Sequence, residues 1–230
     1  MNKIITKYEI KLFPMILSSI LLLIIFKIDT IAPANTGIYL LKILSVPTLA
    51  VISLLISFGK EGLSNIFSKP IKPFKNIALW YAVSIFFSLA SALILKLVLN
   101  FNLQDNPGSK NLAQTLISLP FVLLFEEIIS IFILVVIANF IYKKTKNLFL
   151  SQTIGVTLSC ICFGLLHYST YYNGNMSTTL IHIIFVQGLA RLFFNLSALK
   201  SNSIIVPWII HVLFDFTTFG IGYLISLMLI

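Results

Sequence analysis

The chain contains few charged residues and only two cysteines. Charged residues make up 10% of the 230 positions, whereas hydrophobic residues make up 58%, and the mean hydropathy is +1.02. A soluble globular domain carries about 25% charged residues, so this composition excludes one. The cysteines, Cys160 and Cys162, lie two apart in an apolar run, which excludes a CxxC pair and a disulfide scaffold and predicts buried thiols.

Seven apolar stretches approach or exceed the roughly 20 residues that a helix needs to cross a bilayer. They lie near 12–28, 38–58, 76–99, 112–141, 150–168, 178–196 and 204–228. The last stretch contains Gly220 and Gly222 and could be divided there into two short pieces. We therefore expect an all-α, polytopic membrane protein with seven to eight transmembrane helices, built as a single integral membrane domain over residues 1–230.

The net charge of +9 comes from lysines that gather in alternate connecting segments. These are Lys3, Lys7 and Lys11, then Lys60, Lys69, Lys72 and Lys75, then Lys143, Lys144 and Lys146, and then Lys200. The intervening segments are nearly free of basic residues, and the loop at 100–111 has only Lys110. Because basic loops stay in the cytoplasm, we expect a multi-pass protein of the cell membrane with a cytoplasmic amino terminus. The positive charge is then explained by the orientation of the chain in the membrane. We therefore do not take it as a sign of nucleic-acid binding, and we expect no nucleic-acid partner.

The amino-terminal region imitates a signal peptide, because a basic leader and an apolar run precede Ala32-Pro33-Ala34. The apolar run from Leu12 to Ile28 is longer than the usual core of roughly 7–15 residues. We therefore expect a retained first helix.

A small group of ionisable residues lies inside or at the edges of the apolar stretches. A charged side chain at bilayer depth costs about 2.5–3.5 kcal/mol or more, so each one is a candidate functional residue that faces the interior of the bundle. The group comprises Glu126, Glu127, Asp215, Arg191, His167, His182 and His211. We interpret His182 alone as interfacial.

The spacing of these residues suggests two functional pairs. Neighbours on a helix point about 100° apart, so one of Glu126 and Glu127 can face a reaction centre while the other braces a neighbouring helix. His211 and Asp215 are four apart and share one helix face. They could bind a metal, orient a water or stabilise an oxyanion. Two structural alternatives stay open: both glutamates could form a buried ion-pair network with Arg191, or Asp215 could merely satisfy a buried histidine.

The order of three motifs resembles the CAAX protease and bacteriocin-processing family (CPBP, also called Abi). Glu126-Glu127 resembles the start of its EExxxR motif, Phe163-Gly-Leu-Leu-His167 its FxxxH motif, and His211-Val-Leu-Phe-Asp215 its HxxxN or HxxxD motif. The resemblance covers a core of about residues 112–220. It implies an intramembrane, metalloprotease-like endopeptidase that acts on membrane-associated peptides or precursors of the signalling or bacteriocin type.

The resemblance also implies roles for the residues. Glu126 would activate the attacking water with His167 sharing it, and Glu127 would belong to the same catalytic group. His211 and Asp215 would stabilise the oxyanion, although an aspartate donates only when protonated and would otherwise orient His211. The metal content is open: His167 and His211 could ligate zinc, or the site could work without a metal.

One position departs from the family pattern. The arginine of EExxxR should stand at 131, where the chain has Ile131, so Glu127 needs another partner. Our hypothesis is that Arg191, the only arginine, forms a structural ion pair with Glu127 from the sixth stretch. A non-catalytic immunity or partner-binding protein, or an ion-coupled transporter, are the alternatives.

The depths of the two histidines are a second difficulty. Counted from the cytoplasmic ends at about 1.5 Å per residue, His211 lies roughly 12 Å into its helix and His167 roughly 25 Å into its own. For the two to meet, the fifth helix must start later, nearer Ile154, or tilt strongly.

Overall fold

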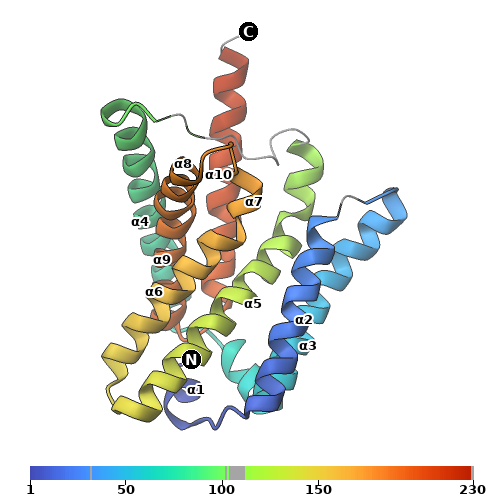
Figure 1. Cartoon of the computed structure of the whole chain (residues 1–230), viewed down its shortest axis with the longest axis vertical. Helices are drawn as coiled ribbons and strands as arrows, with labels where there is room; N and C mark the ends of the chain where they lie inside the picture. Colours follow the sequence, from blue (N-terminus) through green and yellow to red (C-terminus); the bar gives the residue numbers. More distant parts are fainter. Residues whose placement is uncertain (32, 102, 104–111, 229–230) are drawn as a thin grey trace.

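A computed structural model describes residues 1–31, 33–101, 103 and 112–228, with side chains described as far as Ile221 (Figure 1). Lys110, in the loop at 100–111, and Ala32, in the Ala32-Pro33-Ala34 segment, lie outside the described residues. Within the described ranges the chain is helical and has no strand. The elements are α1 (Asn2–Lys7), α2 (Leu12–Thr30), α3 (Thr36–Ile66), α4 (Pro73–Leu93), η1 (Ile94–Val98), α5 (Leu112–Thr145), α6 (Leu148–Leu166), α7 (Tyr168–Tyr171), α8 (Met176–His182), η3 (Ile183–Gly188), α9 (Leu189–Ser201) and α10 (Ile205–Met228).

The seven predicted stretches each correspond to a long helix. Over the described residues, six helical segments are long and apolar enough to cross a membrane, and a shorter apolar segment, Ile205–Ile221, lies in α10. The sixth stretch is formed by α8, the π-helical segment η3 and α9 joined end to end. The expectation of an all-α polytopic membrane protein is confirmed.

One possibility left open by the sequence is not realised, and one expectation was wrong. The last stretch is not divided at Gly220 and Gly222, because α10 is helical from Ile205 to Met228. Glycine in an apolar helix keeps its backbone hydrogen bonds, so the bilayer tolerates it. The cysteines, expected to be buried, are free thiols that are only half-buried.

Helix α5 forms the centre of the bundle and crosses it diagonally (Figure 1). Its buried side chains include Phe125, Ile128, Leu134 and Val135, and it packs against α6, α3 and α10. Helix α6 approaches α5 closely at Gly155, where an added Cβ would lie 2.8 Å from the Leu134 carbonyl oxygen. The absence of a side chain at Gly155 therefore permits α5 and α6 to pack closely.

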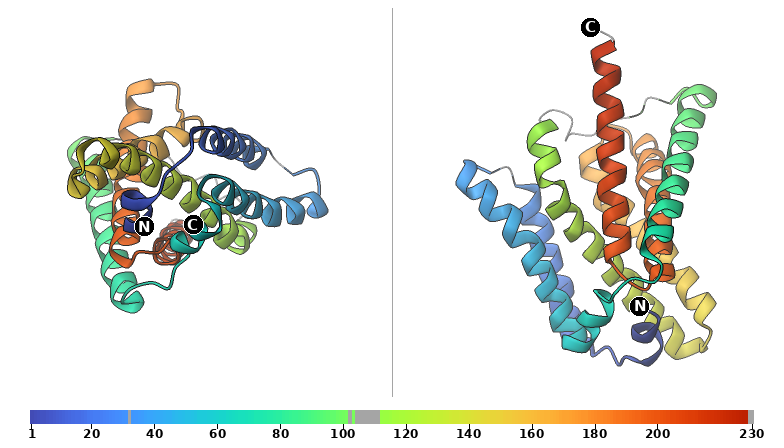
Figure 2. Two further views of the ribbon diagram at one scale, coloured as in Figure 1. Left: turned by 90° about the horizontal axis from the view of Figure 1, so that it is seen from below. Right: turned by 180° about the vertical axis from the view of Figure 1, so that it is seen from behind.

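The connecting segments at one end of the bundle are tied to one another. Asn139 Nδ2 on α5 donates to the carbonyl oxygens of Ile4 and Tyr8, and the backbone N–H of Ile204 donates to the carbonyl of Ile66. Figure 2, seen from below, shows α1 beneath the bundle rather than beside it. The lysine-rich segments of the sequence therefore meet at this end, which we call the basic end.

Candidate active site

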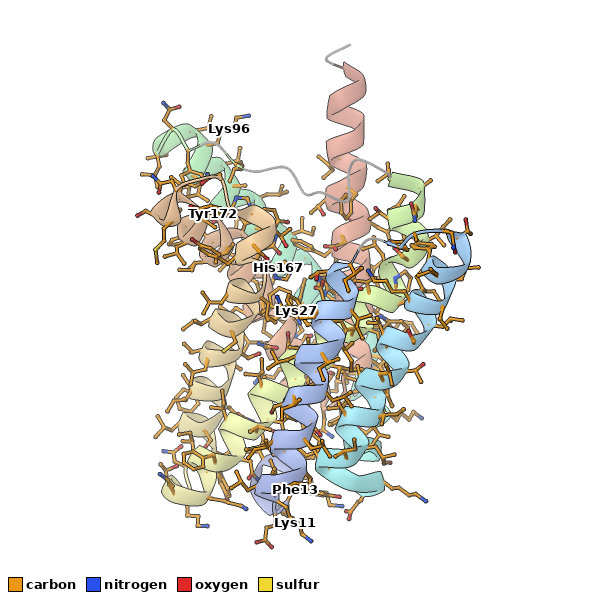
Figure 3. All side chains as sticks on the ribbon, turned by 45° about the vertical axis from the view of Figure 1, so that its right-hand side comes forward. Lys11, Phe13, Lys27, Lys96, His167 and Tyr172 are labelled. Carbon is orange, nitrogen blue, oxygen red and sulfur yellow. The ribbon has the colours of Figure 1, made fainter. Side chains whose placement is uncertain are left out.

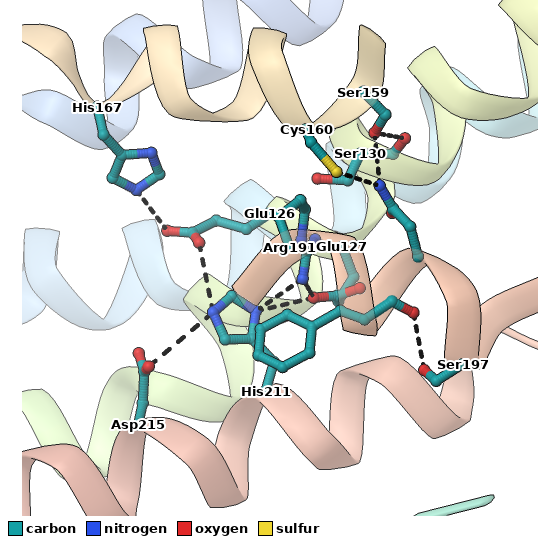
Figure 4. Close-up of polar contacts among 12 residues, drawn as sticks. Glu126, Glu127, Ser130, Ser159, Cys160, His167, Arg191, Ser197, His211 and Asp215 are labelled. Carbon is teal, nitrogen blue, oxygen red and sulfur yellow. Dashed lines mark hydrogen bonds and ion pairs between the residues drawn. The ribbon is translucent and has the colours of Figure 1, made fainter. Parts of the chain in front are cut away.

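Six of the seven ionisable residues that the sequence singles out converge at one place in the bundle (Figure 4). They come from four helices: α5 supplies two glutamates, the end of α6 one histidine, α9 the arginine, and α10 a histidine and an aspartate. The residues are Glu126, Glu127, His167, Arg191, His211 and Asp215.

Glu126 lies between the two histidine rings. Its Oε1 is 4.0 Å from His167 Nε2, and its Oε2 is 3.9 Å from His211 Nε2. Both distances are too long for direct hydrogen bonds. The Glu126 side chain is 23% exposed, so it is not fully enclosed by the bundle.

Glu127 points away from Glu126 and is fully buried. It forms an ion pair with Arg191 Nη2, and its Oε1 lies 2.8 Å from His211 Nδ1. An ionised carboxylate only accepts hydrogen bonds, so the Nδ1 atom of His211 carries the proton. The approach of Arg191 Nη2 to the same nitrogen, at 3.4 Å, is then a contact between two donors. Glu127 therefore orients His211 and leaves Nε2 directed at Glu126.

Arg191 is enclosed by aromatic rings. Its guanidinium carbon lies 4.6 Å from the centroid of Phe163 and 4.8 Å from that of Phe194, and the side chain has no solvent exposure. Both rings favour the cation through the negative charge of their faces. Ile131 is fully buried and carries no charge, and the cation that pairs with Glu127 comes from α9 instead.

His167 is held at the carboxyl end of α6. Its Nδ1 lies 3.0 Å from the carbonyl oxygen of Phe163, which can only accept, so Nδ1 carries the proton and Nε2 faces Glu126. Of the two ways in which the histidines could meet, the later start near Ile154 is wrong, because α6 begins at Leu148. Helix α6 slants across the bundle, and its first turn lies nearer the basic end than the α9–α10 connection does (Figure 1).

Asp215 faces the open side of the His211 ring. Its Oδ1 lies 4.0 Å from Nε2, and the side chain is 18% exposed. The orienting contact expected from Asp215 is made by Glu127 instead. Asp215 is therefore directed toward the same space as Glu126.

The sequence did not identify Tyr171 as a residue near the site, and it suggested the wrong environment for His182. Tyr171 is 4% exposed, its ring lies over His167 with 6.4 Å between centroids, and its hydroxyl accepts a hydrogen bond from Gln187 Nε2. Burial raises the pKa of the Tyr171 phenol, which stays protonated. His182 is not interfacial but buried, with its ring 4.5 Å from that of Tyr171. A lone tyrosine or histidine gives no sequence signal of such packing.

The arrangement of the same side chains bears on the open question of a metal ion. Within the described part of the chain, no group of three or more His, Cys, Asp or Glu side chains is arranged to hold one.

Residues 108–217 match a family model, that of the Rce1-like type II CAAX prenyl endopeptidases. The matched segment contains all six converging residues. No curated protein and no solved structure matches the chain. The family match confirms the resemblance drawn from the three motifs.

Proposed function

We propose, from the membership of residues 108–217 in the Rce1-like type II CAAX prenyl endopeptidase family, that the chain is an endopeptidase acting between its membrane helices. The observation that carries the proposal is the position of the Glu126 carboxylate, whose two oxygens lie 4.0 Å and 3.9 Å from His167 Nε2 and His211 Nε2. A carboxylate between two imidazole nitrogens can take a proton from water and return it to a leaving amine.

The proposed reaction consumes one water molecule for each peptide bond. Glu126 takes one proton from the water, while His167 Nε2 accepts a hydrogen bond from the second. The water oxygen adds to the carbonyl carbon and converts the carbonyl oxygen into an oxyanion. When the C–N bond breaks, Glu126 returns the proton to the nitrogen, and a free amine and a carboxylic acid leave the site.

The oxyanion requires a donor, which we assign to His211 and Asp215. Neither a neutral His211, whose Nε2 has no proton, nor an ionised Asp215 can donate. Glu126, His211 and Asp215 are separated by 3.9 Å and 4.0 Å, so one proton can be held among them as a coupled group. When that proton is on Nε2, the Glu127 carboxylate at Nδ1 balances the charge. A donor of this kind is worth about 100- to 1,000-fold in rate.

The proposed mechanism depends on the glutamate and assigns no step to a metal ion. The substrates that we propose are membrane-associated peptides or precursors of the signalling or bacteriocin type. We also propose that the protein lies in the cell membrane with its amino terminus in the cytoplasm, because most of the 16 basic residues belong to alternate connecting segments.

Cleavage by the full chain in lipid nanodiscs tests the proposal. The probes are a library of internally quenched peptides and, in a separate arm, a farnesylated CAAX peptide. We expect Glu126→Gln to lower kcat/KM by about 100- to 10,000-fold, the usual contribution of a general base. Glu9→Gln is the matched control, because Glu9 is exposed in the amino-terminal segment, and it should cleave like the wild type. Equal cleavage by wild type and Glu126→Gln, or folded wild type that cleaves no probe, would contradict the proposal and favour a non-catalytic protein.

A further inference from the structure

A cavity of about 590 Å³ lies between the α2–α3 hairpin and the first half of α5. Its wall on α5 includes Thr115, Ser118 and Val122, which are half-buried and three or four residues apart, so they share one helix face. Glu126 follows Val122 by four residues and continues that face. On α5 the lining of the cavity therefore ends about one helical turn, roughly 6 Å, before Glu126, on the same face of the helix.

The lining changes along the helices. Near the helix ends, Lys42 Nζ lies 3.4 Å from Asp29 Oδ1, and Tyr39 Oη donates to the carbonyl of Gln114. Further along α3 the lining becomes apolar, with Ile43, Val46 and Pro47. The cavity thus has charged groups and a hydroxyl near the helix ends and apolar side chains further along α3. This lining suits an extended peptide, because a peptide backbone needs polar contacts. It does not suit an acyl chain, which has no polar groups to pair with them.

The cavity lies at the end of the bundle away from the basic end. Figure 3 shows Lys11 and Phe13 at one end of α2, with Lys27, near the other end of the same helix, and His167 in the opposite half. Asp29, which lines the cavity, follows Lys27 by two residues on α2. The lysines of the α3–α4 and α5–α6 connections lie at the end that α1 covers. Access through the cavity is therefore access from the face opposite the lysine-rich connections.

We propose that the substrate enters this cavity from the non-cytoplasmic side as an extended peptide segment and reaches Glu126 along α5. The inference rests on the proposed endopeptidase function and on a cytoplasmic basic end. It names the substrate class as exported peptides, or membrane-anchored precursors cut in the part that lies at the outer face.

Cysteine labelling in intact cells tests the route without requiring activity. Ser118→Cys places a thiol in the cavity, and Lys69→Cys places one at the exposed α3–α4 connection of the basic end. We expect a charged, membrane-impermeant methanethiosulfonate to label Ser118→Cys in intact cells and Lys69→Cys only after the membrane is opened. Wild-type protein gives the background from Cys160 and Cys162. Labelling of Lys69→Cys in intact cells, or of Ser118→Cys only in opened ones, would overturn the proposal.

A matched variant separates the cavity from the adjoining helix surface. Ile117 is the neighbour of Ser118, is 70% exposed and does not line the cavity. Labelled Ser118→Cys should cleave the best probe peptide at least tenfold more slowly, whereas Ile117→Cys treated with the reagent should keep its activity. Cleavage that persists with Ser118→Cys fully labelled would overturn the route while the endopeptidase function stands. Labelling of Ser118→Cys combined with Glu126→Gln should be unchanged, so loss of catalysis cannot be mistaken for loss of access.

Discussion

Arg191 on α9 and Glu127 on α5 form an ion pair from which solvent is fully excluded, although 64 residues separate them in the chain. The same glutamate bonds to His211 Nδ1, so the arginine acts on the site through the carboxylate that orients the histidine. A buried ion pair costs desolvation to form, and removing one partner strands the other charge. We therefore infer that the ion pair positions His211. Transferring the arginine from position 191 to another position beside Glu127 tests this role.

Arg191→Ala should lower the free energy of unfolding by about 3–5 kcal/mol, because Glu127 is left buried without a counter-charge. Cleavage of the probe peptides should fall with it. Adding Ile131→Arg, which returns the arginine to α5 at a buried position, should recover at least tenfold of the lost cleavage. Thermal unfolding in nanodiscs and kcat/KM measure the two effects. If Arg191→Ala folds and cleaves like the wild type, the ion pair has no role.

Asp215 should tolerate asparagine better than alanine. Since Glu127 already orients His211, Asp215 is available to donate to the oxyanion, and an asparagine amide donates at every pH. We expect Asp215→Asn to keep at least half of the wild-type kcat/KM, and Asp215→Ala to lose about 100-fold. Equal losses in both variants would show that the carboxylate charge is what the reaction needs.

Gly155 should be intolerant of a single added methyl group. A Cβ there would lie 2.8 Å from the Leu134 carbonyl oxygen and 3.0 Å from the Ala138 Cβ, so α6 must shift from α5. Gly155→Ala should destabilise the protein by about 1–3 kcal/mol in thermal unfolding. Gly220→Ala is the matched control, because no atom lies within 4 Å of its added Cβ, and it should be neutral or slightly stabilising. A Gly155→Ala variant as stable as Gly220→Ala would contradict the close approach of the two helices.

Chelation should leave cleavage unchanged. The described residues form no group of three that could ligate a metal, and the Glu127 carboxylate is engaged by Arg191 and His211. The measurement pairs metal analysis of the purified chain with cleavage before and after EDTA. Activity that disappears with EDTA and returns with zinc in the wild type would show instead that Glu126, His167 and His211 close around an ion.

The sequence identifies the reactive groups because ionisable residues are costly in a bilayer. Glu126, His167 and His211 are found in this way, and their order in three motifs produces the resemblance to the family. The meeting of the two histidines could not be derived, because it depends on the slant of α6 and on the height at which α10 begins. Neither quantity is encoded in helix periodicity.

Other parts of the site leave no mark in the sequence. Phe163 and Phe194 enclose Arg191, and Tyr171 covers His167, yet 13% of the chain is aromatic, and such rings are common on apolar helices. The amino-terminal segment is basic in sequence, although Ile4 and Ile5 are completely buried in α1. Long-range contacts of common residue types decide these features.

The burial of α1 has an electrical consequence. Asn139 holds the carbonyl groups of the amino-terminal segment, and Ile4 and Ile5 fill the base of the bundle without exposure to solvent. On the proposed route, a peptide that enters from the other end of the bundle would therefore have this apolar layer between it and the basic end. Because ions avoid an apolar barrier, an enzyme built in this way would admit peptide and water to Glu126 without letting ions leak across the membrane.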